Sequence, residues 1–145
     1  FNQGTVSINL ISIAENTKEN EDEFWKILDE RLELCKEALM CRHYALLGTK
    51  SDMSPIHWQH GAIARLKKGE KIDQFLYGDN STLTLGYIGL EETAKMMKSE
   101  SNADTDSEVN EFESKILKYL NDRVKKWRKE TNVGFALKET VLLLK

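Results

Sequence analysis

The chain has 145 residues, of which 40% are hydrophobic and 31% charged, and its formal net charge at pH 7 is −3. This length and composition fit one domain with a real hydrophobic core, and the acidic balance argues against nucleic-acid binding through bulk positive charge. No apolar run approaches the roughly 20 residues of a membrane span, and the start shows no signal-peptide pattern, so we expect a cytoplasmic protein without a membrane partner.

The spacing of apolar residues predicts three short strands with helices between them. Apolar and polar side chains alternate over residues 81–87, which is typical of a strand, and residues 5–11 and 133–137 are two further short strand candidates. Because strands separated by helices cannot pair through tight hairpins, we expect a helix-rich α/β fold with a parallel sheet. Helical spacing covers the intervening segments, with long helices over residues 24–46 and 109–127 and shorter ones over 62–68, 72–76 and 90–94.

Local signals predict where some of these elements begin and end. Asn20, with Glu23 three residues later, is a typical entry to the first long helix, and Gly48 ends it. Residues 98–107 are rich in Ser, Asn and Asp, which predicts a solvated loop.

The chain starts without a methionine and ends in the apolar run 141–144. A self-contained domain seldom begins and ends on strands with unpaired edges, because such edges promote aggregation. We therefore expect that this chain is a piece of a longer one.

Cys35 and Cys41 lie six residues apart on the first long helix, so their side chains are separated by about 240° around its axis. We therefore expect two reduced structural thiols and no disulfide between them. Arg42 and His43 adjoin Cys41, but neighbouring side chains on a helix point apart, so this context does not indicate a nucleophile.

His57 and His60 form a His-x-x-His pair around Trp58. On a helix this spacing would place two imidazoles on one face, which suits a metal ion. A metal site needs further ligands, however, and no Asp, Glu or Cys stands at a matching offset. The pattern therefore favours structural or pocket-lining histidines and no bound metal.

Spacing alone reveals no catalytic group. The carboxylates of Glu91, Glu92 and the acidic block at 19–23 are explained by solvated helix faces and favourable helix N-termini. The sequence has no Gly-x-Ser-x-Gly nucleophile turn and no phosphate-binding loop of the Gly-x-x-x-x-Gly-Lys type. Any assignment of activity must come from longer motifs.

Such motifs run through the chain in a fixed order. The first is the opening Phe1-Asn-Gln-Gly stretch, and another is Ser81-Thr-Leu-Thr-Leu-Gly-Tyr-Ile-Gly-Leu-Glu. Together with their companions they resemble consecutive stretches of the catalytic subunit of anaerobic (class III) ribonucleoside-triphosphate reductases. The matching stretches are residues 1–10, 24–35, 38–43, 54–66, 72–73, 81–91, 120–122 and 132–135.

The resemblance implies a fold and an activity. Residues 1–137 would be a fragment of the family's ten-stranded α/β barrel, and residues 138–145, which depart from the family pattern, a tail of divergent or unrelated sequence. Family members reduce ribonucleoside triphosphates to deoxyribonucleoside triphosphates by glycyl and thiyl radical chemistry, with formate as the usual reductant. An activase that uses an iron–sulfur cluster and S-adenosylmethionine installs the glycyl radical, and cysteines near the C-terminus bind zinc.

The resemblance also implies which residues lie near the substrate. Asn2 matches the asparagine that faces the substrate ribose, which makes it the candidate catalytic and substrate-binding residue. An amide suits this role because it can donate to one hydroxyl and accept from another without titrating. Gln3 and Gly4 would shape the same site, and His57 and His60 are further substrate-binding candidates. Neither cysteine matches the family's radical cysteine, so this chain alone should be inactive and bind no cofactor.

The implied partners are a ribonucleoside triphosphate, nucleotide effectors bound elsewhere, the activase and a second copy in a homodimer of the intact enzyme, with no nucleic acid. Two alternatives stay open. A helical protein-interaction module would use grooves along residues 24–47 and 109–127 and would not need Asn2. Another glycyl-radical enzyme would differ in its reactive cysteine and zinc-binding cysteines.

Overall fold

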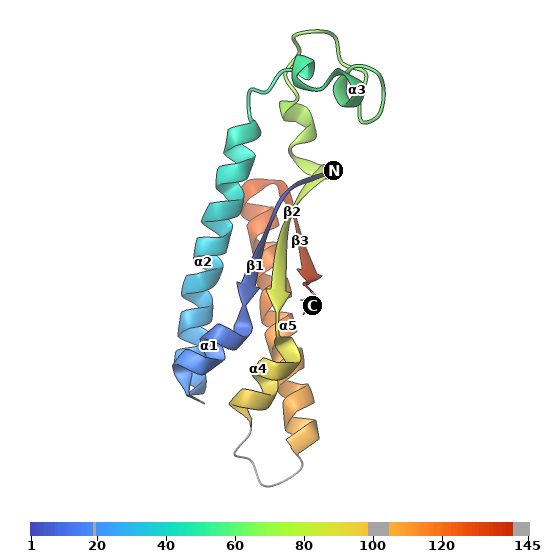
Figure 1. The fold of residues 1–145 in the computed structure, drawn as a ribbon. Helices are drawn as coiled ribbons and strands as arrows, with labels where there is room; N and C mark the ends of the chain where they lie inside the picture. Colours follow the sequence, from blue (N-terminus) through green and yellow to red (C-terminus); the bar gives the residue numbers. More distant parts are fainter. Residues whose placement is uncertain (19, 99–104, 141–145) are drawn as a thin grey trace, which may run out of the picture.

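The computed structural model describes residues 1–18, 20–98 and 105–140 and shows a mixed α/β fold (Figure 1). Strands β1 (Asn2–Asn9), β2 (Gly78–Ile88) and β3 (Val133–Glu139) form a sheet in the order β1-β2-β3. Both neighbouring pairs are parallel, which confirms the predicted sheet type. Each connection between strands passes through a long helix, as parallel pairing requires.

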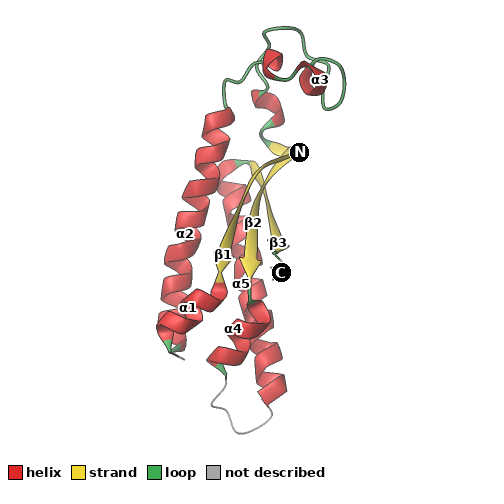
Figure 2. Ribbon diagram, viewed as in Figure 1, coloured by secondary structure: helices red, strands yellow, loops and turns green. Residues whose placement is uncertain are grey.

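Two long helices, α2 (Glu21–Leu46) and α5 (Thr105–Thr131), run along one face of the sheet (Figure 2). Their apolar stripes share one core with the inward side chains of the strands. The two helices also contact each other, since Arg123 of α5 pairs with Asp29 and Glu33 of α2. The fully or almost fully buried core residues on these helices are Phe24, Leu28, Leu32, Leu39, Phe112, Ile116, Leu120 and Trp127.

The structure confirms several of the helices and helix boundaries that the sequence predicts. The side chain of Asn20 accepts a hydrogen bond from the backbone N–H of Glu23 at 3.2 Å, which satisfies a donor at the start of α2. Helix α4 (Leu90–Met97) follows β2 as predicted, and residues 73–75 form a short 3-10 turn, η2 (Asp73–Phe75). Much of the predicted loop, residues 99–104, lies outside the described residues, but α5 already begins at Thr105, so the loop is shorter than predicted.

The strand predicted over residues 5–11 is wrong at both ends. It begins at Asn2, and Leu10 opens helix α1 (Leu10–Thr17). The Asn9 side chain caps this helix by accepting a hydrogen bond from the Ser12 N–H at 3.3 Å. Branched aliphatic residues at the junction are compatible with both a strand and a helix. The helix forms here because it buries one side of the segment, which consists of Leu10, Ile13, Ala14 and Thr17.

The helix predicted over residues 62–68 is also wrong. The segment is irregular, and the short helix α3 (Pro55–Trp58) precedes it, with Pro55 at its first turn. The backbone N–H groups of Ala64 and Leu66 donate to the carbonyls of His57 and Trp58 at 3.0 and 2.7 Å. Because these donors bond back to α3, they cannot build a helix of their own. Residues 47–77, which we call the cap, lie beyond the amino ends of the strands (Figure 1).

None of the helices within residues 1–18, 20–98 and 105–140 combines the length and the apolar character that crossing a membrane would require.

Candidate functional site

The two faces of the sheet differ in chemistry. The face that α2 and α5 cover carries apolar side chains, including Ile8, Leu83, Leu85 and Phe135. Parallel sheets are usually apolar on both faces, so the small and polar character of the opposite face needs an explanation. We call it the polar face, and the strand register assigns to it Asn2, Thr5, Ser7, Asn9, Thr82, Thr84, Gly86, Ile88, Gly134, Ala136, Lys138 and, just past β3, Thr140.

Asn2 lies exposed at the amino end of β1, on the polar face. Its Nδ2 donates to Oγ1 of Thr5 at 3.2 Å and to Oγ1 of Thr84, on the neighbouring strand, at 3.1 Å. Its Oδ1 accepts from the backbone N–H of Gly4 at 2.8 Å. The amide is thereby held in one orientation by partners on two strands, which is the geometry that a binding residue needs.

Gln3 lies on the opposite face from Asn2. Asn2 pairs with Thr82 and Gly4 with Leu83, so Gln3 is the extra residue of a β-bulge. Its side chain is buried against α2 and the cap, where Nε2 donates to the Leu76 carbonyl at 2.9 Å and to Ser81 Oγ at 2.7 Å. Gln3 therefore shapes the strand entry from behind the polar face.

Gly4 also faces α2. A β-carbon at this position would overlap the Cδ atom of Arg42, so glycine is required for the Arg42 side chain to pass over the strand. The structure thus brings Asn2, Gln3 and Gly4 together, and it assigns the exposed amide to Asn2 and the close helix contact to Gly4.

A second polar link lies further along the same face. The hydroxyls of Ser7 and Thr140 are 3.1 Å apart and meet above Gly86. A β-carbon at residue 86 would lie 2.5 Å from both oxygens, which explains the glycine. Sequence reasoning missed Ser7, Thr84 and Thr140. The signal that could have found the first two is the run of small hydroxyl residues on one side of each strand.

His57 and His60 lie exposed on the cap, which the packing of Trp58 on Phe1 attaches to the start of β1, with ring centres 5.4 Å apart. His57 Nδ1 lies 2.5 Å from the Ser54 hydroxyl. Neither histidine forms a hydrogen bond with Asn2. Within the described ranges, no group of three or more His, Cys, Asp and Glu side chains could hold a metal ion.

His43 is a buried titratable residue in contact with Gln3, and sequence reasoning missed its role. Only 1% of it is exposed, and its Nδ1 lies 2.9 Å from Gln3 Oε1. Burial lowers the pKa of His43 below its ordinary value of 6.5, while the negative charge of Asp73 opposes the shift. The imidazole is therefore neutral at physiological pH.

The two cysteines are not bonded to each other, as predicted. Cys35 is buried in the core, and this burial raises the pKa of its thiol, with a smaller opposing effect from Arg31. Cys41 is exposed. A buried thiol with a raised pKa is a poor nucleophile, which agrees with a structural role for Cys35.

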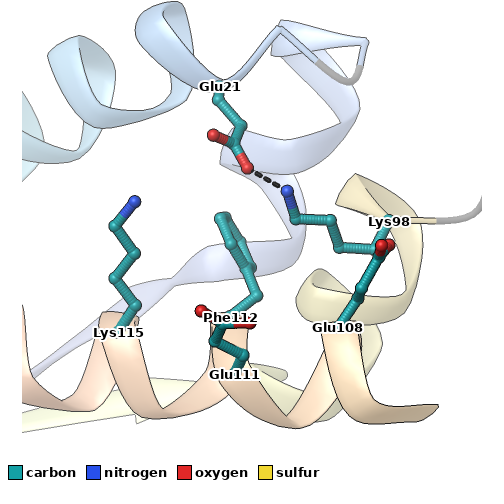
Figure 3. A pocket seen from close by; sticks show the side chains of 6 residues that line it. All are labelled: Glu21, Lys98, Glu108, Glu111, Phe112 and Lys115. Carbon is teal, nitrogen blue, oxygen red and sulfur yellow. Dashed lines mark hydrogen bonds and ion pairs between the residues drawn. The ribbon is translucent and has the colours of Figure 1, made fainter. Parts of the chain in front are cut away.

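A charged hollow lies at the other end of the sheet, between α2, α4 and the start of α5 (Figure 3). Lys98 pairs there with Glu21, and its Nζ lies 5.2 Å from the ring centre of Phe112. Glu108, Glu111 and Lys115 complete the lining. Its lining carries both signs of charge, with Lys98 and Glu21 forming an ion pair across two elements, and it contains none of the predicted site residues.

Comparison with known proteins identifies one family, by a family model and by individual relatives. The family model for anaerobic ribonucleoside-triphosphate reductase matches residues 1–140. The chain is 39% identical over 140 residues to the protein of that name from Haemophilus influenzae, and 34% identical to the one from Escherichia coli, covering 96% of this chain and 20% of each relative. The reductase of Enterobacteria phage T4 is 34% identical over 144 residues and is covered to 22%. The chain therefore spans about a fifth of the length of these relatives.

Proposed function

The chain belongs to the anaerobic ribonucleoside-triphosphate reductase family, and we propose that it is the part of such an enzyme that holds the substrate ribose. The complete enzyme would convert ribonucleoside triphosphates to deoxyribonucleoside triphosphates by glycyl and thiyl radical chemistry. In that reaction the 2′-hydroxyl leaves as water and formate is oxidised to carbon dioxide. The observation that carries the proposal is the exposed Asn2 amide, fixed on the polar face of a parallel sheet.

The finer fold belongs to the same proposal. We propose that β1, β2 and β3 are neighbouring strands of the family's ten-stranded α/β barrel. In that barrel α2 and α5 would lie outside and the polar face would line the interior. A barrel interior that binds a nucleotide requires hydroxyl and amide groups, whereas the outside of each strand must be apolar to pack on its helix. The opposite chemistry of the two faces, with Leu83 and Leu85 on one and Thr84 on the other, supports this orientation.

Asn2 can bind a ribose by exchanging one of its present partners. Of the two hydroxyls that accept from Nδ2, Thr84 is buried and Thr5 is exposed. A ribose hydroxyl would replace Thr5, while the bond to Thr84 keeps the amide in its orientation. Gln3 and Gly4 would contribute by shaping the strand, and we retain His57 and His60 as substrate contacts from the cap.

The remaining components of the reaction would be supplied by the rest of the protein and by its partners. These are the radical glycine with its iron–sulfur and S-adenosylmethionine activase, the radical cysteine, the sites for nucleotide effectors and a homodimeric partner. The described residues do not fit a zinc ion bound by cysteines, because Cys35 is buried and Cys41 points outward on the same helix. We propose a cytoplasmic enzyme without a nucleic-acid or membrane partner.

No observation favours the alternative that the chain is a helical protein-interaction module. Such a module would present apolar grooves along α2 and α5, but the stripes that would line them, including Phe24, Leu28, Phe112 and Ile116, are buried against the sheet.

The test uses the complete reductase that contains this segment, with activase, formate and CTP. Replacing Asn2 by Ala should lower kcat/KM for dCTP formation at least tenfold, because one hydrogen bond to the substrate contributes about 1.4 kcal/mol. Asn110→Ala removes an exposed amide on α5, away from the polar face and without a side-chain hydrogen bond to the described residues, so it is the matched control and should retain activity. The 145-residue chain alone should form no dCTP. Unchanged kcat/KM in the Asn2→Ala enzyme, or turnover by the chain alone, would refute the proposal.

A further inference from the structure

The face on which Asn2 lies depends on the bulge beside it. From Thr5 onward β1 alternates regularly, with Thr5 and Ser7 on the polar face and Val6 and Ile8 towards the helices. Continuing that alternation backwards would place Gln3 on the polar face and Asn2 towards the helices, because side chains alternate with a period of two. The extra residue reverses both, so that Gln3 is buried and Asn2 is exposed.

The bulge is held by the side-chain amide of Gln3, which has partners on three segments. Its Nε2 donates to the Leu76 carbonyl in the cap and to Ser81 Oγ at the irregular start of β2. Both hydrogens of the amide are therefore used, and Oε1 is left to accept. The group that faces Oε1, at 2.9 Å, is Nδ1 of His43 on α2.

This arrangement determines the tautomer of His43. Because Gln3 Oε1 can only accept, His43 must carry a hydrogen on Nδ1 and donate it. The ring is held in that orientation by its neighbours, since the ring of Tyr77 packs edge-on at 4.9 Å and that of Tyr44 at 5.7 Å. Because His43 is only 1% exposed, loss of its donor would leave the Gln3 oxygen buried without a partner.

We propose that His43 is a positioning residue for the ribose site: its Nδ1–H holds Gln3 in the bulge, and the bulge presents Asn2 on the polar face. The chain of contacts is continuous, from His43 to Gln3, from Gln3 to the pairing of β1 with β2, and from that register to the bond between Asn2 and Thr84. The link to substrate rests on the proposed function, whereas the link from His43 to Asn2 does not.

Two variants separate positioning from packing. His43→Asn places an amide N–H where Nδ1 lies but leaves space beside Tyr77. His43→Leu fills more of the space but has no donor. If His43 only filled volume, Leu would be the better replacement; if it positions Gln3, Asn would be.

The first readout is the side-chain amide of Asn2 in the 145-residue chain, followed by NMR with ¹⁵N labelling. In the unmodified chain the His43 ¹⁵N shifts should report a neutral ring protonated at Nδ1. His43→Leu should speed hydrogen exchange of the Asn2 and Gln3 side-chain amides at least tenfold, and His43→Asn should restore slow exchange. Equal protection in both variants, or a ring protonated only at Nε2, would overturn the proposal.

The second readout is turnover of CTP by the complete reductase carrying the same substitutions. His43→Leu should lower kcat/KM at least tenfold, as Asn2→Ala does, and His43→Asn should recover most of this loss. Combining His43→Leu with Asn2→Ala should lower kcat/KM no further, because both act through one amide. Additive losses would overturn the positioning role. If Asn2→Ala leaves turnover unchanged, the proposed function fails while the exchange experiment still decides how His43 acts on Asn2.

Discussion

The Nδ2 of Asn2 lies 3.1 Å from Oγ1 of Thr84, so a single hydrogen bond joins residues that are 82 positions apart in the chain. It crosses from the edge strand to the central strand of the sheet on its polar face. Thr84 is only 6% exposed, whereas Asn2 is exposed, so the bond ties an accessible amide to a buried hydroxyl. A residue that must meet a ligand in one orientation gains that orientation from such a partner.

Replacing Thr84 by Val should remove this partner with little change in shape. We expect the chain to lose about 1 kcal/mol in its free energy of unfolding, because one buried acceptor is lost. Urea unfolding followed by circular dichroism measures the difference. Thr82→Val, on the same strand and face but without a side-chain hydrogen bond to the described part of the chain, should change stability by much less. Equal effects of the two substitutions would show that the bond to Asn2 contributes nothing.

Gly4→Ala should destabilise the protein through Arg42. The added β-carbon would overlap the Arg42 side chain, and moving that side chain or the strand should cost about 1–3 kcal/mol. Arg42→Ala makes room, so the double variant should recover most of the loss. A double-mutant cycle of unfolding free energies measures this coupling. Simple additivity of the two changes would mean that residue 4 and Arg42 do not compete for space.

His43 should make stability depend on pH below about 6.5, the ordinary pKa of its imidazole. Its pKa in the folded chain is lowered, mainly by burial among Gln3, Tyr77 and Tyr44, with Asp73 opposing. Below pH 6.5 the unfolded chain therefore binds a proton that the folded chain does not bind until lower pH. Stability should fall as the pH decreases through this window, by at most about 1.4 kcal/mol per pH unit, and should be insensitive to His43 above it.

The control for that prediction is His43→Asn, which cannot titrate. Its unfolding free energy should fall less as the pH decreases below about 6.5 than that of the unmodified chain. Since all other titrating groups are shared, the difference between the two proteins isolates His43. An identical fall in both would contradict the lowered pKa.

The two thiols should react at very different rates. Cys41 is exposed and should react with a chromogenic thiol reagent within minutes, whereas Cys35 is buried with a raised pKa and should react only when the protein unfolds. The Cys41→Ser variant should therefore show no fast reaction in buffer and one reactive thiol in denaturant. Rapid labelling of Cys35 in the folded variant would contradict its burial, because it would show that reagent reaches the side of α2 that packs on the core.

The sequence by itself determined the elements whose signals are local. The Asn20 cap and the regular apolar stripe of α2 act within one or two helical turns, and strands separated by helices have few ways to pair other than in parallel. The irregular residues 62–68 were misjudged because their backbone donors bond back to α3, which no periodicity reports. The motif that begins with Phe1 identified Asn2 as a candidate but not its surroundings.

Only the tertiary structure decided which way the site residues point. Gln3 and His43 are 40 residues apart, and nothing in the local pattern of either indicates the other. One extra residue in β1 reverses the faces of Asn2 and Gln3, because side chains alternate along a strand, and it is stabilised by groups from α2, the cap and β2. A sequence pattern reflects preferences over a few residues, whereas this bulge exists because three distant segments satisfy one buried amide.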